Sequence, residues 1–411
     1  HSSTTDSTGT GVFTSSITGL INGTIYFYRA YVTNELGTTY GEEYSFTTMP
    51  LGSGTSGDPY QISTLNELRW ISESTSRWNK HYIQTANINA SDTQNWNSGT
   101  GFIPIGNSST YFTGEYNGKG YEIDGVYIYR DSSDYQALFG YLDGAVIDSL
   151  GLINVNITGE DYTGALSGYI YSSSIIRYCY TTGSVSGLYD VGGLVGRSYY
   201  NTSINNSYSI CSVTGYSKVG GLVGLREYNS SINKCYSTGS VTGSNAGGLV
   251  GYSYGGSVSN SFWDTETSGQ ISSEGGTGKT TAEMQSLSTF LNAGWDFMDE
   301  TANGTNDIWG INYSDNGAYP FLGWQGFVHN AYPCDGAGTE ADPYLVDSHY
   351  DLIWISMETS TWSSYFLQTA DIDASLTMNL NEGSGFSPIG NSSTKFTGNY
   401  DGQMFELNGL Y

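Results

Sequence analysis

The sequence predicts an all-β protein built on a parallel β-helix, a solenoid of stacked turns. First, a glycine-bounded box recurs at nearly constant spacing, with starts 27 or 28 residues apart: QALFG at 136–140, GALSG at 164–168, and GGLVG at 192–196, 220–224 and 247–251. Second, apolar residues alternate with Ser, Thr and Asn between the boxes, which is the period of a strand. A repeat of this length suits one turn made of three strands of roughly five residues each, plus corners.

Equivalent positions of the repeat predict ladders of like side chains, because stacked turns lie about 4.8 Å apart. The leucine ladder, expected inside, is Leu138, Leu166, Leu194, Leu222 and Leu249. The aromatic ladder is Tyr180, Tyr208, Tyr236 and Phe262. Glycines beside the leucines permit tight corners and close backbone approach. We therefore expect residues 100–262 to form consecutive turns of the solenoid.

The boxes and the sequence between them resemble the GLUG repeat of bacterial surface adhesins and large secreted proteins. A typical stretch is CYSTGSVTG at 235–243, which leads into the next box. The resemblance implies a β-helical stalk or adhesin region on a bacterial surface. It implies no particular ligand.

Residues 1–49 form the first of three predicted domains. A strand is expected at 26–32 and a returning strand at 43–47, joined by a turn at 34–37. The segment resembles the C-terminal half of a fibronectin type III domain. The residues that support this resemblance are Leu20, Tyr26 and Tyr28. Half a sandwich leaves an open edge, so we expect other strands to complete it.

Residues 52–324 form the second predicted domain, a β-helix with capping segments. Ser63 or Thr64 followed by Glu67 predicts a capping box and a short helix over the first turn. A helix at 281–291 and aromatic-rich strands after it resemble the cap that follows GLUG arrays. The glycine-rich stretch 275–281 is interpreted as a flexible turn before that helix. It is not a phosphate loop, because Ser273 stands where such a loop needs glycine.

Residues 336–411 form the third predicted domain and repeat residues 52–127 at a constant offset of 284. Trp70 corresponds to Trp354 and Tyr127 to Tyr411. These residues should be the opening turns of a second β-helix. The partial sandwich and the open solenoid should be completed by further chain or by neighbouring copies, head-to-tail, as in a filament.

The composition favours an extracellular location. Only 13% of the residues are charged, while the chain holds 56 glycines and 36 tyrosines. A net charge of −26 argues against nucleic-acid binding. The sequence contains no stretch of about 18 apolar residues, so it predicts no membrane span. Cys179, Cys211 and Cys235 are expected to be reduced, because equivalent positions two turns apart are too distant for a disulfide.

The search for chemistry gives one calcium candidate and no catalytic site. Asp299, Asn303 and Asp307 belong to an oxygen-rich loop that suits Ca²⁺, although its spacing is not that of an EF-hand. The four histidines do not form a zinc-peptidase pair. Paired carboxylates of the kind that polysaccharide-cleaving β-helices use are not recognisable. We therefore expect no enzyme and no other cofactor.

The predicted function is that of an extracellular structural or adhesive repeat protein, forming a stalk or filament on a bacterial surface. The alternative is a module that binds a glycan or a protein through its tyrosine-rich faces, since aromatic rings stack on sugars and anchor interfaces. Glycans and host or cell surfaces are then its partners. A polysaccharide-degrading enzyme is the least favoured alternative.

Overall fold

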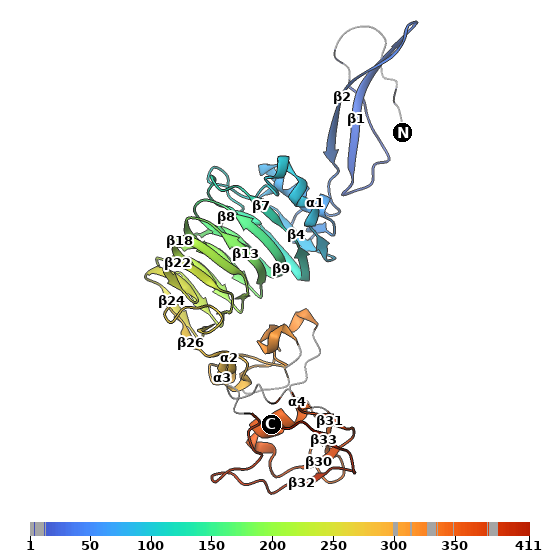
Figure 1. Ribbon diagram of the computed structural model, residues 1–411. Coiled ribbons are helices and arrows are strands. Elements are labelled where there is room, and N and C mark those ends of the chain that lie inside the picture. The colour runs from blue at the N-terminus through green and yellow to red at the C-terminus, as the bar shows by residue number, and fades with distance from the viewer. Residues whose placement is uncertain are drawn as a thin grey trace. The chain divides into compact units, whose positions relative to one another are not determined.

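The computed structural model describes residues 4, 12, 14–298, 303–312, 315–326, 334, 336–347, 349–375, 377 and 385–411. The chain divides into two compact units, His1–Thr281 and Ala282–Tyr411. The first unit contains a parallel β-helix of about five turns, which confirms the predicted fold class (Figure 1). We call one full turn of this solenoid a rung.

One face of the solenoid is a five-stranded parallel sheet, counted over the described residues. Its strands are β8 (Phe139–Asp143), β11 (Ser167–Tyr171), β15 (Val195–Tyr199), β19 (Val223–Glu227) and β23 (Val250–Tyr254). Val195 pairs with Val223 and Val223 with Val250, so residues one repeat apart in sequence lie side by side in space. The 27- or 28-residue period is therefore the spacing of the hydrogen-bonded register.

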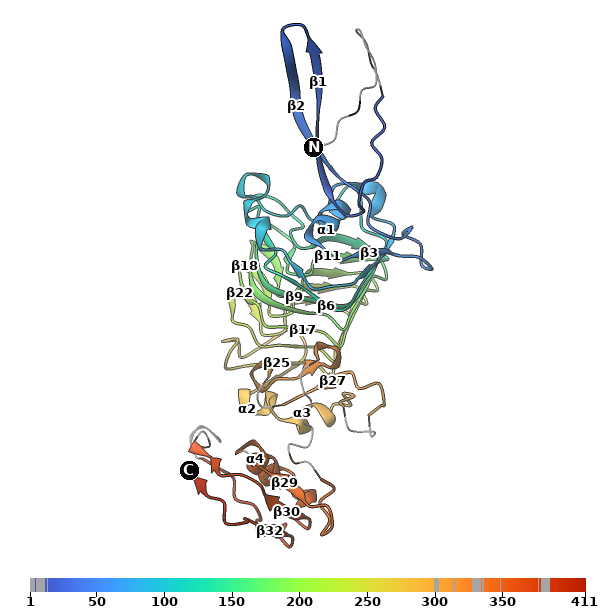
Figure 2. The same cartoon turned by 90° about the vertical axis from the view of Figure 1, so that its right-hand side faces the viewer.

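The remaining faces belong to one sheet that follows the chain around the solenoid (Figure 2). Its first nine strands are β3 (Tyr60–Ile62), β4 (His81–Gln84), β5 (Ile88–Asn89), β6 (Glu115–Asp124), β7 (Tyr127–Tyr129), β9 (Val146–Thr158), β10 (Thr163–Gly164), β12 (Ile175–Arg177) and β13 (Tyr180–Ser186). The later strands are β14 (Tyr189–Gly192), β16 (Ser203–Asn205), β17 (Tyr208–Ser209), β18 (Ser212–Gly220), β20 (Ser231–Asn233), β21 (Tyr236–Ser237), β22 (Val241–Gly247), β24 (Ser257–Ser259), β25 (Phe262–Asp264) and β26 (Thr277–Lys279).

The leucine ladder lies in the core of the solenoid. Leu138, Leu166, Leu194, Leu222 and Leu249 are all fully buried. The backbone N–H of Leu194 donates to Leu222 O at 3.0 Å, and that of Leu222 donates to Leu249 O at 2.9 Å. Each leucine therefore sits directly on the one before it.

The aromatic ladder is also buried, and its rings stack. Centroids of Tyr180 and Tyr208 lie 5.0 Å apart, and those of Tyr208 and Tyr236 lie 4.7 Å apart with an interplanar angle of 6°. Tyr236 pairs in register with Phe262. At the other end of the ladder Gly151 occupies the equivalent position, and a Cβ there would lie 2.6 Å from the Tyr180 ring. Glycine thus leaves room for that ring.

Each glycine of the GGxxG box is required by a different backbone contact. A Cβ on Gly220 would lie 1.9 Å from Val223 O, and one on Gly221 would lie 2.2 Å from Gly248 O. A Cβ on Gly224 would lie 2.4 Å from Val191 N, because the corner of the preceding rung folds over it. No side chain fits at these distances. The box is therefore a packing motif, and it turns Leu222 into the core.

Helix α1 (Leu65–Ser72) packs at the beginning of the solenoid, where the centroid of its Trp70 ring lies 5.1 Å from that of Tyr60 in β3 (Figure 2). Thr64 is its N-cap: Thr64 Oγ1 accepts from Glu67 N at 3.3 Å, and Glu67 Oε2 accepts from Thr64 N at 3.0 Å. Leu68 and Ile71 are fully buried in the same core as the leucine ladder. The first rung pairs β3 with β4, so the solenoid begins about 40 residues before the predicted 100–262.

The N-terminal segment contains an antiparallel hairpin, β1 (Ile25–Asn34) and β2 (Gly37–Thr47). The returning strand starts at Gly37 rather than at residue 43, because backbone pairing between the two strands continues up to the two-residue turn. Ile21 N donates to Tyr26 Oη at 2.8 Å, a bond of the tyrosine-corner kind. Phe27 is 68% exposed, and the hairpin forms a sheet of its own. The fibronectin type III likeness therefore stays a prediction.

Residues 277–279 were wrongly expected to be a flexible turn. They form β26, which pairs in parallel with β25 through Thr277 and Lys279. Gly275 and Gly276, with φ of 146° and 84°, bend the chain so that Thr277 reaches the free edge of β25. The open donors and acceptors of that edge are satisfied by this added strand.

The second unit begins with two short helices where one was expected at 281–291. Helices α2 (Thr281–Met284) and α3 (Leu287–Leu291) are separated because Ser286 N and Thr289 N donate three residues back, to Glu283 O and Ser286 O. These tighter bonds interrupt the α-helical pattern. Strands β27 (Trp309–Gly310) and β28 (Phe321–Leu322) then pair in antiparallel fashion.

The rest of the second unit repeats the opening of the first. Its elements are β29 (Tyr344–Val346), α4 (His349–Met357), β30 (Tyr365–Gln368), β31 (Ile372–Asp373), β32 (Asn399–Asp401) and β33 (Leu407–Asn408). The hydroxyl of Tyr400 donates to Gln368 Oε1 at 3.2 Å, and that of Tyr116 donates to Gln84 Oε1 at 3.0 Å. The 284-residue sequence repeat is therefore a structural repeat as well.

Cys179, Cys211 and Cys235 form no disulfide, and their side chains are buried. Burial raises the pKa of Cys211 to about 11 and that of Cys235 to about 12. Cys179 lies in the core with its pKa raised by the same cause. These thiols are thus small core residues and poor nucleophiles.

Candidate functional site: a tyrosine-rich face

Nine tyrosines form one connected set of ring contacts on and beside the five-stranded sheet. We call this set the tyrosine face: Tyr111, Tyr135, Tyr141, Tyr162, Tyr169, Tyr171, Tyr199, Tyr200 and Tyr228. Leu142 and Ile170 are in the core. Because side chains alternate along a strand, Tyr141 and Tyr169 project from the outer side of the sheet.

The central rings of the face cover one another. Ring centroids lie 4.4 Å apart for Tyr111 and Tyr141, and 4.6 Å apart for Tyr141 and Tyr169. Tyr169 is nearly buried in this stack, Tyr141 is half-buried and Tyr111 is exposed. Burial raises the pKa of both the Tyr141 and the Tyr169 phenol, so these hydroxyls stay protonated and neutral.

The rings at the ends of the set are open. Tyr200 is 49% exposed and Tyr228 is 54% exposed, against 9% for Tyr169. Tyr200 and the neighbouring Asn201 both have positive φ, at a corner of the solenoid. This uncommon conformation turns the side chain of Tyr200 outward. The face therefore combines a closed central stack with open rings at its margin.

A second corner column borders the face on its other side. Tyr135, Tyr162, Asp190 and Lys218 follow one another at 27- or 28-residue intervals, and their φ values lie between 55° and 60°. Left-handed backbone is costly for residues other than glycine, Asn or Asp. Here the pairing of successive rungs holds it in place, since Tyr135 N donates to Asp161 O at 2.9 Å.

Arg197 lies in the middle of the face and is neutralised there. Its Nε donates to Glu227 Oε2 at 2.7 Å, and its Nη1 lies 3.7 Å from Asp190 Oδ2. Lys218 Nζ lies 3.4 Å from the other Asp190 oxygen. The guanidinium carbon is 5.5 Å from the Tyr169 ring centroid. Two cations and two largely buried carboxylates thus balance one another across two rungs.

Asp190 should make stability depend on pH. Burial raises the pKa of its carboxyl, and the nearby Lys218 and Arg197 offset this only in part. The folded chain therefore binds a proton that the unfolded chain releases, and the protein gains stability as pH falls through the raised pKa. Relative to Asp190→Asn, the wild type should gain unfolding free energy between pH 7 and pH 4, as measured by urea unfolding.

Asp58→Asn provides the matched control, because Asp58 is exposed and lies outside this network. The difference between wild type and Asp58→Asn should not change over the same pH range. An unchanged difference between wild type and Asp190→Asn would show that burial of Asp190 carries no pH-dependent cost.

The calcium candidate is only partly within the described residues. Asp299 lies outside them. Asn303 Nδ2 donates to Leu291 O at 3.0 Å, and Asp307 has a φ of 50°. Among the described residues, no group of three or more His, Cys, Asp or Glu side chains could hold a metal ion.

The sequence predicted the side-chain ladders, because they occupy positions at which the repeat is preserved. It did not predict the Arg197 network, because that network occupies positions at which the repeat is interrupted. Equivalent positions read Tyr169, Arg197 and Leu225 on neighbouring strands. The sequence did contain a usable signal. Asp190 occupies the repeat position at which the preceding rung has Tyr162, and its charge is opposite to that of Arg197. Opposite charges at neighbouring off-pattern positions of a repeat indicate an ion pair across rungs.

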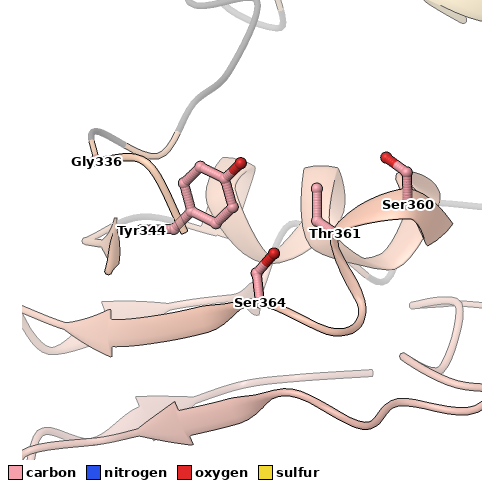
Figure 3. A pocket seen from close by; sticks show the side chains of 5 residues that line it. All are labelled: Gly336, Tyr344, Ser360, Thr361 and Ser364. Carbon is pink, nitrogen blue, oxygen red and sulfur yellow. The ribbon is translucent and has the colours of Figure 1, made fainter. Parts of the chain in front are cut away.

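The second unit has a small hollow lined by Gly336, Tyr344, Ser360, Thr361 and Ser364 (Figure 3). In the first unit the positions equivalent to Thr361 and Ser364 are Arg77 and Lys80. The Arg77 guanidinium lies over the Trp70 ring, 4.0 Å from its centroid. The second unit therefore carries two shorter side chains at these positions.

Comparisons with known proteins agree with the repeat and the fold. The GLUG motif matches residues 215–242. The chain is 38% identical over 149 residues to halomucin of Haloquadratum walsbyi, which is 35% of this chain and 2% of halomucin. It is 34% identical over 130 residues to a protein of Evansella cellulosilytica provisionally named Gly-rich membrane protein, which is 29% of this chain and 14% of that protein. It therefore spans a small fraction of both relatives.

One solved structure has a similar fold, that of a candidate immunoglobulin A1 protease from Bacteroides ovatus. The TM-score is 0.51 at 19% sequence identity, over 66% of this chain and 94% of that one. At this identity the likeness concerns the fold alone. The GLUG match and the solenoid together support a GLUG-repeat β-helix protein. Within the described residues, no helix is long and apolar enough to cross a membrane.

Proposed function

We propose that this chain is part of an extracellular, surface-associated repeat protein with a structural and adhesive role. The observation that carries the proposal is the solenoid, in which a GLUG-type repeat stacks on itself rung by rung. Such a fold makes a long, stiff scaffold whose side chains point outward at regular intervals. The names of the relatives, a halomucin and a Gly-rich membrane protein, support a place at the cell surface.

The modular organisation supports the stalk or filament part of the proposal. The second unit repeats elements of the opening of the solenoid after 284 residues: β29, α4, β30 and β31 correspond to β3, α1, β4 and β5. Repeated modules of this kind extend a molecule when they follow one another in series. Head-to-tail contact between modules or copies is part of this proposal, as is a fibronectin type III-like domain around the β1–β2 hairpin.

The adhesive role is assigned to the tyrosine face. Tyrosine rings offer both apolar surface and a hydroxyl group, which is the combination found at binding surfaces. A non-catalytic role is also part of the proposal. The Asp190 and Glu227 carboxylates of this face are held by Arg197 and Lys218, so they are not poised as an acid–base pair.

The surface location can be tested on cells of the source organism. Antibodies against the purified chain should label intact cells, and external protease should remove the label. Deletion of the gene should reduce attachment of the cells to a solid surface. Labelling that requires permeabilised cells would overturn the location, and normal attachment of the deletion strain would overturn the adhesive role.

A further inference from the structure

We propose that the tyrosine face binds a neutral polysaccharide. This inference deepens the proposed adhesive role and rests on it. Part of the face is periodic, because neighbouring rungs carry tyrosines at paired positions about 4.8 Å apart, Tyr141 with Tyr169 and Tyr171 with Tyr199. A periodic array fits a ligand that is itself periodic, and a polysaccharide repeats one sugar unit along its length.

The open rings are the expected stacking sites. Tyr200 and Tyr228 are about half exposed. A sugar ring can lie against such a ring and bury its C–H groups. The rings of the central stack cannot serve in this way, because their faces already cover one another. Tyr111 and Tyr141, which are not buried, contribute hydroxyl groups that can donate to and accept from sugar hydroxyls.

The charges of the face select an uncharged ligand. Arg197 and Lys218 are paired with Glu227 and Asp190, and the two carboxylates are 6% and 2% exposed. No unpaired cation remains among the described residues of this network to attract an acidic polymer. The chain as a whole carries −26, which repels polyanions further. The same net charge attracts a cationic polymer to the whole surface, so binding of such a polymer does not depend on the tyrosine face.

The scaffold is rigid, which lowers the entropic cost of binding. Tyr199 contacts four other rings of the face and packs beside Arg197, whose guanidinium carbon lies 5.4 Å from its centroid. Side chains that are already ordered lose little freedom when a ligand arrives. Shallow binding over several rungs can then reach useful strength through repetition along the polymer.

The test uses the whole purified chain and gel electrophoresis through immobilised polysaccharides. The neutral probes are dextran, mannan, xylan and a β-1,3-glucan; the acidic probes are alginate and polygalacturonate, and the cationic probe is chitosan. The wild type should be retarded by at least one neutral probe and by neither acidic probe, and any retardation by chitosan should be the same in the variants of the tyrosine face. The double variant Tyr200→Ala/Tyr228→Ala should weaken that binding about tenfold.

Tyr129→Ala provides the matched control, because Tyr129 is 48% exposed and lies outside the nine-ring set. It should bind as the wild type does, and thermal melting should show that all variants fold. The proposal is overturned if no neutral probe retards the wild type, if only a charged probe does, or if Tyr129→Ala loses as much as the double variant. Adhesion of intact cells without polysaccharide binding would leave the proposed function standing and remove this inference.

Discussion

Leu222→Asp should lower the unfolding free energy of the solenoid by more than about 5 kcal/mol. Leucine-to-alanine changes in a packed core cost about 2–5 kcal/mol through lost contacts and an unfilled cavity. Aspartate adds the penalty for burying a carboxyl group with no partner. Leu222 is fully buried between Leu194 and Leu249, so water cannot reach the new carboxylate. Urea unfolding followed by circular dichroism measures the loss.

Ile271→Asp is the control for this change, because Ile271 is 94% exposed in the same unit. It should shift the unfolding midpoint very little. If both variants lost the same stability, or if Leu222→Asp were as stable as the wild type, Leu222 would not be a core residue and the register of the rungs would be wrong.

Gly224→Ala should cost about 3 kcal/mol or more, although it adds a single methyl group. The new Cβ would lie 2.4 Å from Val191 N, 2.5 Å from Asp190 C and 2.7 Å from Gly196 O. All three are backbone atoms held by pairing between rungs, so none can rotate away as a side chain could. Overpacking of this kind usually costs about 1–3 kcal/mol, and a rigid backbone places it at the upper end. Thermal unfolding measures the effect.

Gly57→Ala tests whether steric contact is the cause. A Cβ added at Gly57 would have no heavy atom within 4 Å, and the backbone there has no positive φ, so alanine should be tolerated or slightly stabilising. A large loss at both sites would point to backbone entropy or an unrelated cause. A neutral result at Gly224 would mean that successive rungs can move apart, contrary to the contacts seen here.

The solenoid could be predicted from the sequence because its rules are local and repeated. The same alternation, the same glycines and the same leucine recur at one period, and each copy supports the interpretation of the others. Thr64 and Glu67 likewise marked the start of α1 through a short-range capping pattern. The 284-residue duplication predicted the elements of the second unit for the same reason.

The features that were missed depend on contacts between rungs that no short-range pattern encodes. β26 exists because Phe262–Asp264 left a strand edge open, which the glycine-rich sequence of 275–281 does not reveal. The Arg197 network joins residues 30 positions apart and interrupts the tyrosine pattern instead of following it. The ring contacts of the tyrosine face depend on the direction in which each tyrosine projects at a corner of the solenoid. Positive φ at Tyr200 and Tyr162 sets that direction.

The common register of the rungs has a consequence for heredity. Gly164 pairs with Gly192, Gly192 with Gly220, and Gly220 with Gly247. An in-frame loss or gain of one repeat's codons between two such glycines would rejoin the sheets with every backbone bond remade. The gene can therefore change length in whole rungs, while a length change inside a paired strand must be absorbed by a bulge, as in the 27-residue rung that pairs β18 with β22. Arg197 and Glu227 lie on neighbouring rungs, so a repeat gained between them would separate the pair, and a repeat lost at Gly192 or Gly220 would remove one partner, while the fold stays intact.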